Sequence, residues 1–284
     1  MSRRWYFSRV SHLVSVLTVV ASASGCDTRE VELGDALVTL GLSDPEPLPA
    51  RTIDVLIDGT PGSPAGSLPL VVEEVNLAAL SIEERPGSRL RVWTLATATD
   101  EAQLRFERTV PERSGSFRRA PGPSFADGLA SELGTALGPA LAEAAEARTS
   151  PIATSIERVL LADGTGQRFV IVLGDGRERA GGLNLECGSV SVRRFRASLE
   201  RREILPEGSL QARPVRIEFA RFGLERLRGR SCRATVARER AIRSVWTELL
   251  TDAGARSVNF RSGHAELDLD PDTSAPGAQD EETE

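Results

Sequence analysis

The chain has 284 residues, with 35 basic side chains against 41 acidic ones and a formal net charge of −6. Eight of the 41 acidic residues lie after Ala265, so the rest of the chain is closer to neutral, which argues against nucleic acid as a partner. A chain of this length can bury a substantial core, so one domain with tails is the simplest organisation.

The first 25 residues have the three zones of a cleavable export signal. Arginines stand at positions 3, 4 and 9, an apolar stretch covers 10–21, and small residues fill 21–25. The apolar stretch is shorter than the roughly 20 residues of a membrane-spanning helix, which excludes a transmembrane anchor. The pair Arg3-Arg4 is similar to that of a twin-arginine signal. Export through the general secretory route and export in the folded state therefore both stay open.

Cys26 follows the signal directly, and the segment Ala-Ser-Gly-Cys at 23–26 resembles a lipobox, although lipoboxes usually begin with Leu. That resemblance implies that Cys26 receives diacylglycerol on its sulfur and becomes the first residue of the mature protein. The alternative is an ordinary secretory signal followed by a coincidental Cys. We therefore expect a lipoprotein of the cell envelope, attached to a membrane, with its domain in the periplasm or on the cell surface.

Two further cysteines, Cys187 and Cys232, lie in the second half of the chain. In an oxidising compartment an even pair favours a disulfide, and two unpaired buried thiols are the alternative. Neither residue has a second Cys or a His within ligand spacing, which disfavours a metal site.

A Pro-rich tether at 26–50 precedes an alternation of strands and helices. In chain order we predict a strand at 52–57, a helix at 70–84, strands at 90–96 and 102–110, helices at 125–147 and 151–161, a strand at 169–173, a helix at 192–202, a strand at 214–222, a helix at 235–253 and a strand at 258–261. Gly134, Gly138 and Pro139 predict a break in the helix at 125–147. The five apolar residues at 169–173 are typical of a strand buried on both faces.

This alternation predicts an α/β fold with a doubly wound, mostly parallel sheet flanked by helices, of the Rossmann-like kind. The domain is expected to cover 51–263. Residues 264–284 are rich in Asp, Glu, Pro, Ser and Gly, a composition that cannot bury enough apolar surface to order itself.

Polar side chains follow two of the predicted strands and precede one helix. Asp58 and Thr60 come after the first strand, Ser150 stands before the helix at 151–161, and Asp175 follows the strand at 169–173. The carboxyl ends of parallel strands meet at one edge of a sheet, so these side chains should converge there. Carboxylate and hydroxyl oxygens are ligands suited to Mg²⁺ or a similar divalent cation.

This set resembles the metal-ion-dependent adhesion site of von Willebrand factor A-type domains, which is built from Asp-x-Ser-x-Ser, a later Thr and an Asp-Gly. Asp58, Thr60, Ser150 and Asp175 match four of its positions, whereas Gly62 replaces the second Ser and Ser63 lies one residue late. The resemblance covers the whole predicted domain. It implies an A-type fold, Mg²⁺ at Asp58, Thr60, Ser63, Ser150 and Asp175, and a protein partner that completes the metal coordination with a carboxylate.

Other interpretations of the same residues stay open. Asp58 and Asp175 can instead cap the helices that follow, with glycines as turn residues, and the domain is then a metal-free scaffold of the envelope. Asp58-Gly59-Thr60 is also similar to part of the Asp-x-Asp-Gly-Thr motif of haloacid dehalogenase-type phosphatases. Leu56 occupies the position of their nucleophile, however, and a well-placed His for other hydrolases is absent from the sequence. A binding protein is therefore expected rather than an enzyme.

Overall fold

The computed structural model describes residues 48–61, 63–95, 102–112, 124–147, 149–162, 166–180, 185, 191–211, 215–222 and 236–262. All of them belong to the second of two units of the chain, which begins at Pro47. The export signal, Cys26, Cys187, Cys232 and the acidic tail lie outside the described residues. Lipidation and the disulfide therefore stay predictions.

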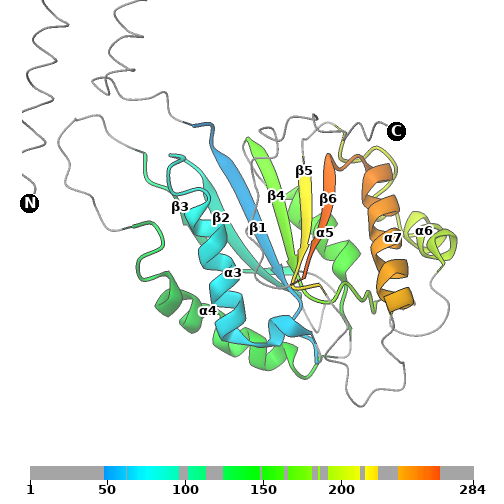
Figure 1. Cartoon of the computed structure of the whole chain (residues 1–284), viewed down its shortest axis with the longest axis horizontal. Coiled ribbons are helices and arrows are strands. Elements are labelled where there is room, and N and C mark those ends of the chain that lie inside the picture. Colours follow the sequence, from blue (N-terminus) through cyan, green and yellow to red (C-terminus); the bar gives the residue numbers. More distant parts are fainter. Residues whose placement is uncertain are drawn as a thin grey trace, which may run out of the picture. The chain divides into compact units, whose positions relative to one another are not determined.

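Six strands form one sheet in the order β3-β2-β1-β4-β5-β6 (Figure 1). β2 pairs antiparallel with β3, and every other neighbouring pair is parallel. This arrangement confirms the predicted α/β fold with a mostly parallel sheet. The strands are β1 (Arg51–Ile57), β2 (Arg89–Leu95), β3 (Ala102–Thr109), β4 (Gln167–Leu173), β5 (Val215–Ala220) and β6 (Ser257–Arg261).

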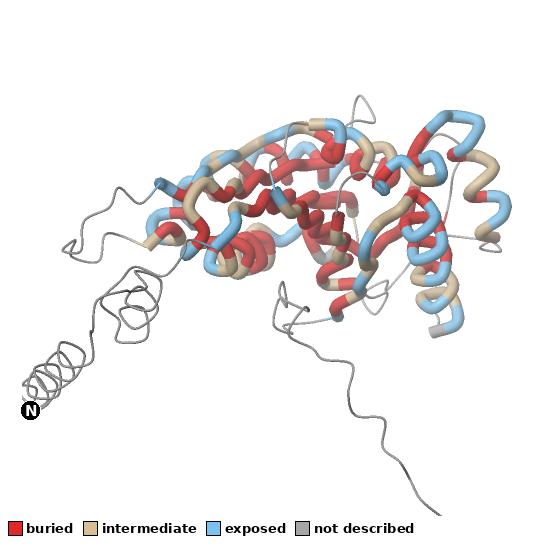
Figure 2. Tube along the Cα trace, turned by 90° about the horizontal axis from the view of Figure 1, so that it is seen from above, coloured by how far each residue is buried: buried red, intermediate tan, exposed pale blue. Residues whose placement is uncertain are grey.

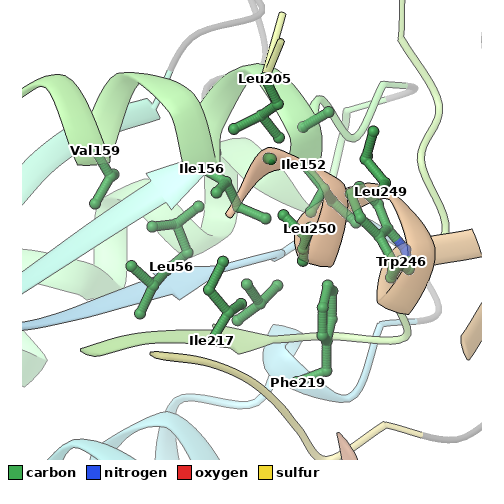
Figure 3. Close-up of a cluster of buried hydrophobic side chains, with 14 of the residues drawn as sticks. Leu56, Ile152, Ile156, Val159, Leu205, Ile217, Phe219, Trp246, Leu249 and Leu250 are labelled. Carbon is green, nitrogen blue, oxygen red and sulfur yellow. The ribbon is translucent and has the colours of Figure 1, made fainter. Parts of the chain in front are cut away.

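Helices cover both faces of the sheet and enclose two hydrophobic cores. α3 (Leu68–Leu80) and α4 (Leu129–Ala144) pack on one face, over a core that contains Ile53, Val55 and Ile57 of β1. α5 (Ile152–Leu161), α6 (Val192–Glu200) and α7 (Val236–Ala253) pack on the other face, where Trp246 contacts the aromatic rings of Phe195 and Phe219 (Figure 3). Among the described helices, none is both long enough and apolar enough to cross a membrane.

The sequence of each strand matches its place between these layers. Every residue of β1 is buried, and so are all but the first of β4, because both strands lie in the middle of the sheet with helices on either side. Figure 2 shows the buried positions gathered in the interior and the exposed ones along the outer segments. The edge strand β3 instead carries mostly half-exposed and exposed residues, with charged side chains that discourage pairing with another chain.

The helix α4 is unbroken, so the predicted break at Gly134, Gly138 and Pro139 is wrong. Pro139 lies inside the helix but faces solvent, where the carbonyl that it leaves without a helical hydrogen bond can bind water. The buried face of α4, formed by Leu129, Leu133, Leu137, Ala140, Leu141 and Ala144, continues past this point. Packing of that face on the sheet outweighs the low helix propensity of Pro.

We expect Pro139→Ala to stabilise the domain by about 2 kcal/mol, because it restores a helical hydrogen bond and removes a steric clash without changing the core. Urea unfolding followed by circular dichroism measures the change. Gly134→Ala lies earlier in the same helix, with no atom within 4 Å of the added methyl group, and should stabilise the domain by about 1 kcal/mol. A loss of stability in Pro139→Ala would mean that the proline fits a bend that the core requires.

Candidate functional site

The predicted site lies between the carboxyl ends of β1 and β4, the two strands from which the chain continues to opposite faces of the sheet. β1 and β4 are parallel neighbours, with Ile57 opposite Leu173, and the Asp58 N–H donates to the Leu173 carbonyl at 2.9 Å. After β1 the chain enters α3 on one face, and after β4 it continues to α6 on the other. Such a switch point opens between the carboxyl ends of the strands, where α/β proteins place their ligand sites.

Asp58 is the central side chain of this region and is almost fully buried. Its Oδ1 accepts hydrogen bonds from the Thr60 hydroxyl at 2.6 Å and from the Thr60 N–H at 3.1 Å. The residue that follows β4 must be a glycine, Gly174, because a Cβ there would lie 2.8 Å from the Asp58 Cβ. Asp58 and Thr60 are thus held as a pair against the end of β4.

Ser150 joins this pair from the segment before α5. An isolated antiparallel bridge with Arg179 fixes its backbone through N–H to carbonyl bonds of 3.1 and 2.9 Å. The Ser150 side chain is buried, and its hydroxyl has no hydrogen-bond partner of standard geometry in the described part of the chain. It nevertheless lies close enough to Asp58 to act on that carboxyl group as a hydrogen-bond donor, which lowers the pKa of Asp58.

The environment of Asp58 disfavours its charged form. Burial and, second to it, the negative charge of Asp175 raise the pKa of Asp58, the hydrogen bonds from Thr60 and Ser150 lower it, and the net result is a pKa of about 6. The influence of Asp175 shows that the two carboxyl groups, which are more than a hundred residues apart in sequence, are electrostatic neighbours.

Asp175 is engaged by a residue that the sequence did not single out. Its Oδ1 accepts from the Arg177 N–H at 3.0 Å, and its Oδ2 accepts from Arg177 Nε at 2.7 Å and from Arg177 Nη2. Both side chains of this ion pair are buried, at 1% and 3% exposure. A charged group needs such a partner when it leaves water, so each of the two residues requires the other.

Glu178 adds a third buried carboxyl group and was also missed. Its Oε2 accepts from the Ala153 N–H at 2.8 Å, which places it at the N-terminus of α5. Burial raises the pKa of Glu178 to about 8, and the backbone N–H groups of Ala153 and Ile152 offset part of that effect. We call Asp58, Thr60, Ser150, Asp175, Arg177 and Glu178 the switch-point cluster.

The predicted ligand Ser63 contacts the switch-point cluster only through its backbone, among the described residues: its N–H donates to the Thr60 carbonyl at 3.0 Å. Its hydroxyl instead accepts from the Ala65 N–H at 3.3 Å and caps the short 3-10 helix η1 (Pro64–Gly66). Asp58 and Asp175 each bond the residue two positions later, so neither caps the next helix as the alternative interpretation required. Gly62 lies outside the described residues.

The cluster does not fit a divalent cation as the sequence predicted. Asp175 gives both carboxylate oxygens to Arg177, whose fully buried guanidinium already supplies a positive charge there. A second cation beside Asp175 would be repelled strongly, because charges attract and repel more strongly in the protein interior than in water. In the described part of the chain no group of three or more His, Cys, Asp or Glu side chains has the arrangement of a metal site.

The cluster is also closed to a large ligand. Asp58, Thr60, Ser150 and Asp175 are exposed by 1, 3, 0 and 2%. A partner protein in contact with this edge therefore meets the loops around the cluster, whose positions the buried hydrogen bonds determine. Gly66, the last residue of η1, and Ser67, which follows it, are exposed there.

Comparisons with known proteins gave no match: no protein-family model and no curated protein is similar to this sequence. The position that corresponds to a phosphatase nucleophile holds Leu56, which is fully buried in the core beneath α5.

Proposed function

We propose that this protein is a lipoprotein of the cell envelope, anchored through Cys26, whose A-type domain binds another protein. The observation that carries the proposal is the convergence of Asp58, Thr60, Ser150 and Asp175 at the switch point of the sheet. These are four positions of the adhesion motif that the sequence resembles, and they come from three separate segments of the chain.

The contact surface is formed by the loops at the carboxyl ends of β1 and β4. Buried hydrogen bonds within the switch-point cluster hold these loops in one arrangement, so less conformational entropy is lost when a partner binds. Recognition by preformed loops on a rigid sheet is a common way for α/β folds to bind their ligands. The proposal needs no chemical step.

Site-specific photo-crosslinking in intact envelopes tests the proposal. A photoreactive phenylalanine analogue at Ser67, which is exposed at the carboxyl end of β1, should crosslink to a discrete protein partner. The matched control is Glu207, which is equally exposed but lies in the segment that leads into β5, at the opposite edge of the sheet. The Ser67 product should weaken several-fold in Asp58→Asn, because that change disturbs the loop beneath the contact.

Equal crosslinking from Ser67 and Glu207, or a Ser67 product that Asp58→Asn leaves unchanged, would contradict a binding surface at the switch point. Release of the protein from membranes by Cys26→Ser would support the lipid anchor separately, whatever the outcome of the crosslinking.

A further inference from the structure

Arg177 forms an ion pair with Asp175, the carboxylate to which the adhesion motif would assign a cation. Arg177 is two residues after Asp175, so the carboxylate accepts from both its backbone N–H and its guanidinium. Both groups are almost completely buried, which means that the pair was removed from water as a unit. A guanidinium cannot lose its charge in a protein, so this positive charge is permanent.

The loop that carries this pair is fixed on both sides. Gly176, between the two residues, has φ +70, and a Cβ there would lie 2.6 Å from Phe222 Cε2. The Gly176 carbonyl accepts a hydrogen bond of 2.7 Å from Trp246 Nε1 on α7. The backbone that carries Asp175 and Arg177 therefore cannot shift without breaking its contact with α7.

Two of the hydroxyl groups that would bind a metal, those of Thr60 and Ser150, nevertheless lie beside Asp58. Thr60 uses its hydroxyl proton on Asp58, which leaves the lone pairs of its oxygen available. The buried Ser150 hydroxyl likewise acts as a donor toward Asp58, so the lone pairs of its oxygen are also available. The cluster thus resembles a metal site with oxygen ligands in which a different positive charge stands in place of the metal ion.

We propose that Arg177 replaces the divalent cation of the adhesion motif, so that the domain is independent of metal. The inference rests on the proposed A-type domain, because only that resemblance assigns a cation to these residues. Arg177 neutralises Asp175 and holds the loop after β4, which are the structural tasks that a metal would perform. The chemical consequence is that contact with a partner survives chelation.

Thermal unfolding of the purified full-length protein in detergent tests this without any partner. The Tm of the wild type should be the same in excess MgCl₂ and in EDTA. Arg177→Met should have a lower Tm in EDTA, because two carboxyl groups then remain buried without their counter-charge. Saturating Mg²⁺ should raise the Tm of this variant by roughly 5–10 °C.

Two controls assign the effect to this site. Arg193→Met removes an exposed arginine of α6 and should leave the Tm insensitive to Mg²⁺. The double variant Arg177→Met/Asp58→Asn should lose the Mg²⁺ response of the single variant. Where Arg177→Met does not fold in EDTA, Arg177→Gln, which can still donate to Asp175, provides the same comparison.

Two results would overturn the inference. A Mg²⁺-dependent rise in the wild-type Tm that is lost in Asp58→Asn would show that a cation binds beside Arg177. If Mg²⁺ leaves the Tm of Arg177→Met and Arg177→Gln unchanged, as it does for the wild type, then Arg177 does not take the place of a metal ion. Neither result depends on the crosslinking of Ser67, so this inference and the proposed function can fail separately.

Discussion

Asp54→Ala should lower the free energy of unfolding by about 3–5 kcal/mol, the largest effect that we expect from a single substitution in this domain. Asp54 lies in the middle of β1 and is fully buried. It accepts from Arg91 Nε at 2.7 Å, from Trp93 Nε1 at 2.9 Å and from Arg168 Nε at 3.1 Å. Removal of its carboxylate leaves two buried guanidinium groups without the charge that balances them.

The ion pair of Asp54 with Arg168 also connects the sheet to the C-terminus of α5. Arg168 Nη1 donates to the carbonyls of Leu160 and Ala162 at 2.8 and 3.0 Å, at the C-terminus of α5, where a positive charge is favoured by the helix dipole. Loss of Asp54 should therefore loosen the attachment of α5 as well as the contact between β1 and β2. Urea unfolding measures the effect, with Asp54→Asn expected to lie between the wild type and Asp54→Ala.

Glu84→Ala is the control for this substitution, because it removes an exposed acid just after α3 and should change the stability by less than about 0.5 kcal/mol. A loss below about 1 kcal/mol in Asp54→Ala would mean that water or a rearranged neighbour compensates the two arginines.

Glu178→Gln should change how stability depends on pH. Burial raises the pKa of Glu178 from 4.5 in the unfolded chain to about 8 in the folded protein, so between these values the folded state holds the proton more tightly. The stability that this group contributes is fully present below pH 4.5 and is lost as the pH rises through 8. Gln keeps an acceptor for the Ala153 N–H and does not titrate.

We expect the free energy of unfolding of the variant to rise relative to that of the wild type by roughly 4 kcal/mol as the pH rises through this window. Urea unfolding at a series of pH values from 4.5 to above 8 checks it. For Glu207→Gln, at an exposed position, the difference from the wild type in free energy of unfolding should stay constant with pH. The pKa of Asp58, raised to about 6, gives a slope of the same sign in both proteins. Parallel curves for Glu178→Gln and the wild type would contradict a proton held by buried Glu178.

The fold was predictable because apolar patterning reports burial directly. The strands at 52–57 and 169–173 and the helix around Trp246 were located to within about three residues, since each is bounded by glycine, proline or a change in periodicity. The convergence of Asp58 with Asp175 followed from the order of the elements. The break assigned to Pro139 was wrong because propensity was weighed without knowing which side of α4 faces solvent.

The buried charges were missed for a different reason. A charged residue usually indicates an exposed position, so nothing in the sequence singled out Arg177 and Glu178 as buried. A usable signal did exist for Asp54, which interrupts an apolar strand, and for Arg91, which interrupts the next one. Asp54 and Arg91 are direct neighbours in the register of β1 and β2. Opposite charges on adjacent buried strands predict such a pair, whereas the partner of Asp175 depends on a loop conformation that periodicity does not encode.

The hydrogen bond between the Trp246 indole and the Gly176 carbonyl has a practical consequence. The indole is fully buried in α7, as Figure 3 shows, yet it is bonded to the loop that carries Asp175 and Arg177. Emission from an indole depends on the polarity and hydrogen bonding around its ring nitrogen. Any partner that shifts this loop must stretch or break that bond, so the domain contains its own optical reporter of events at the switch point.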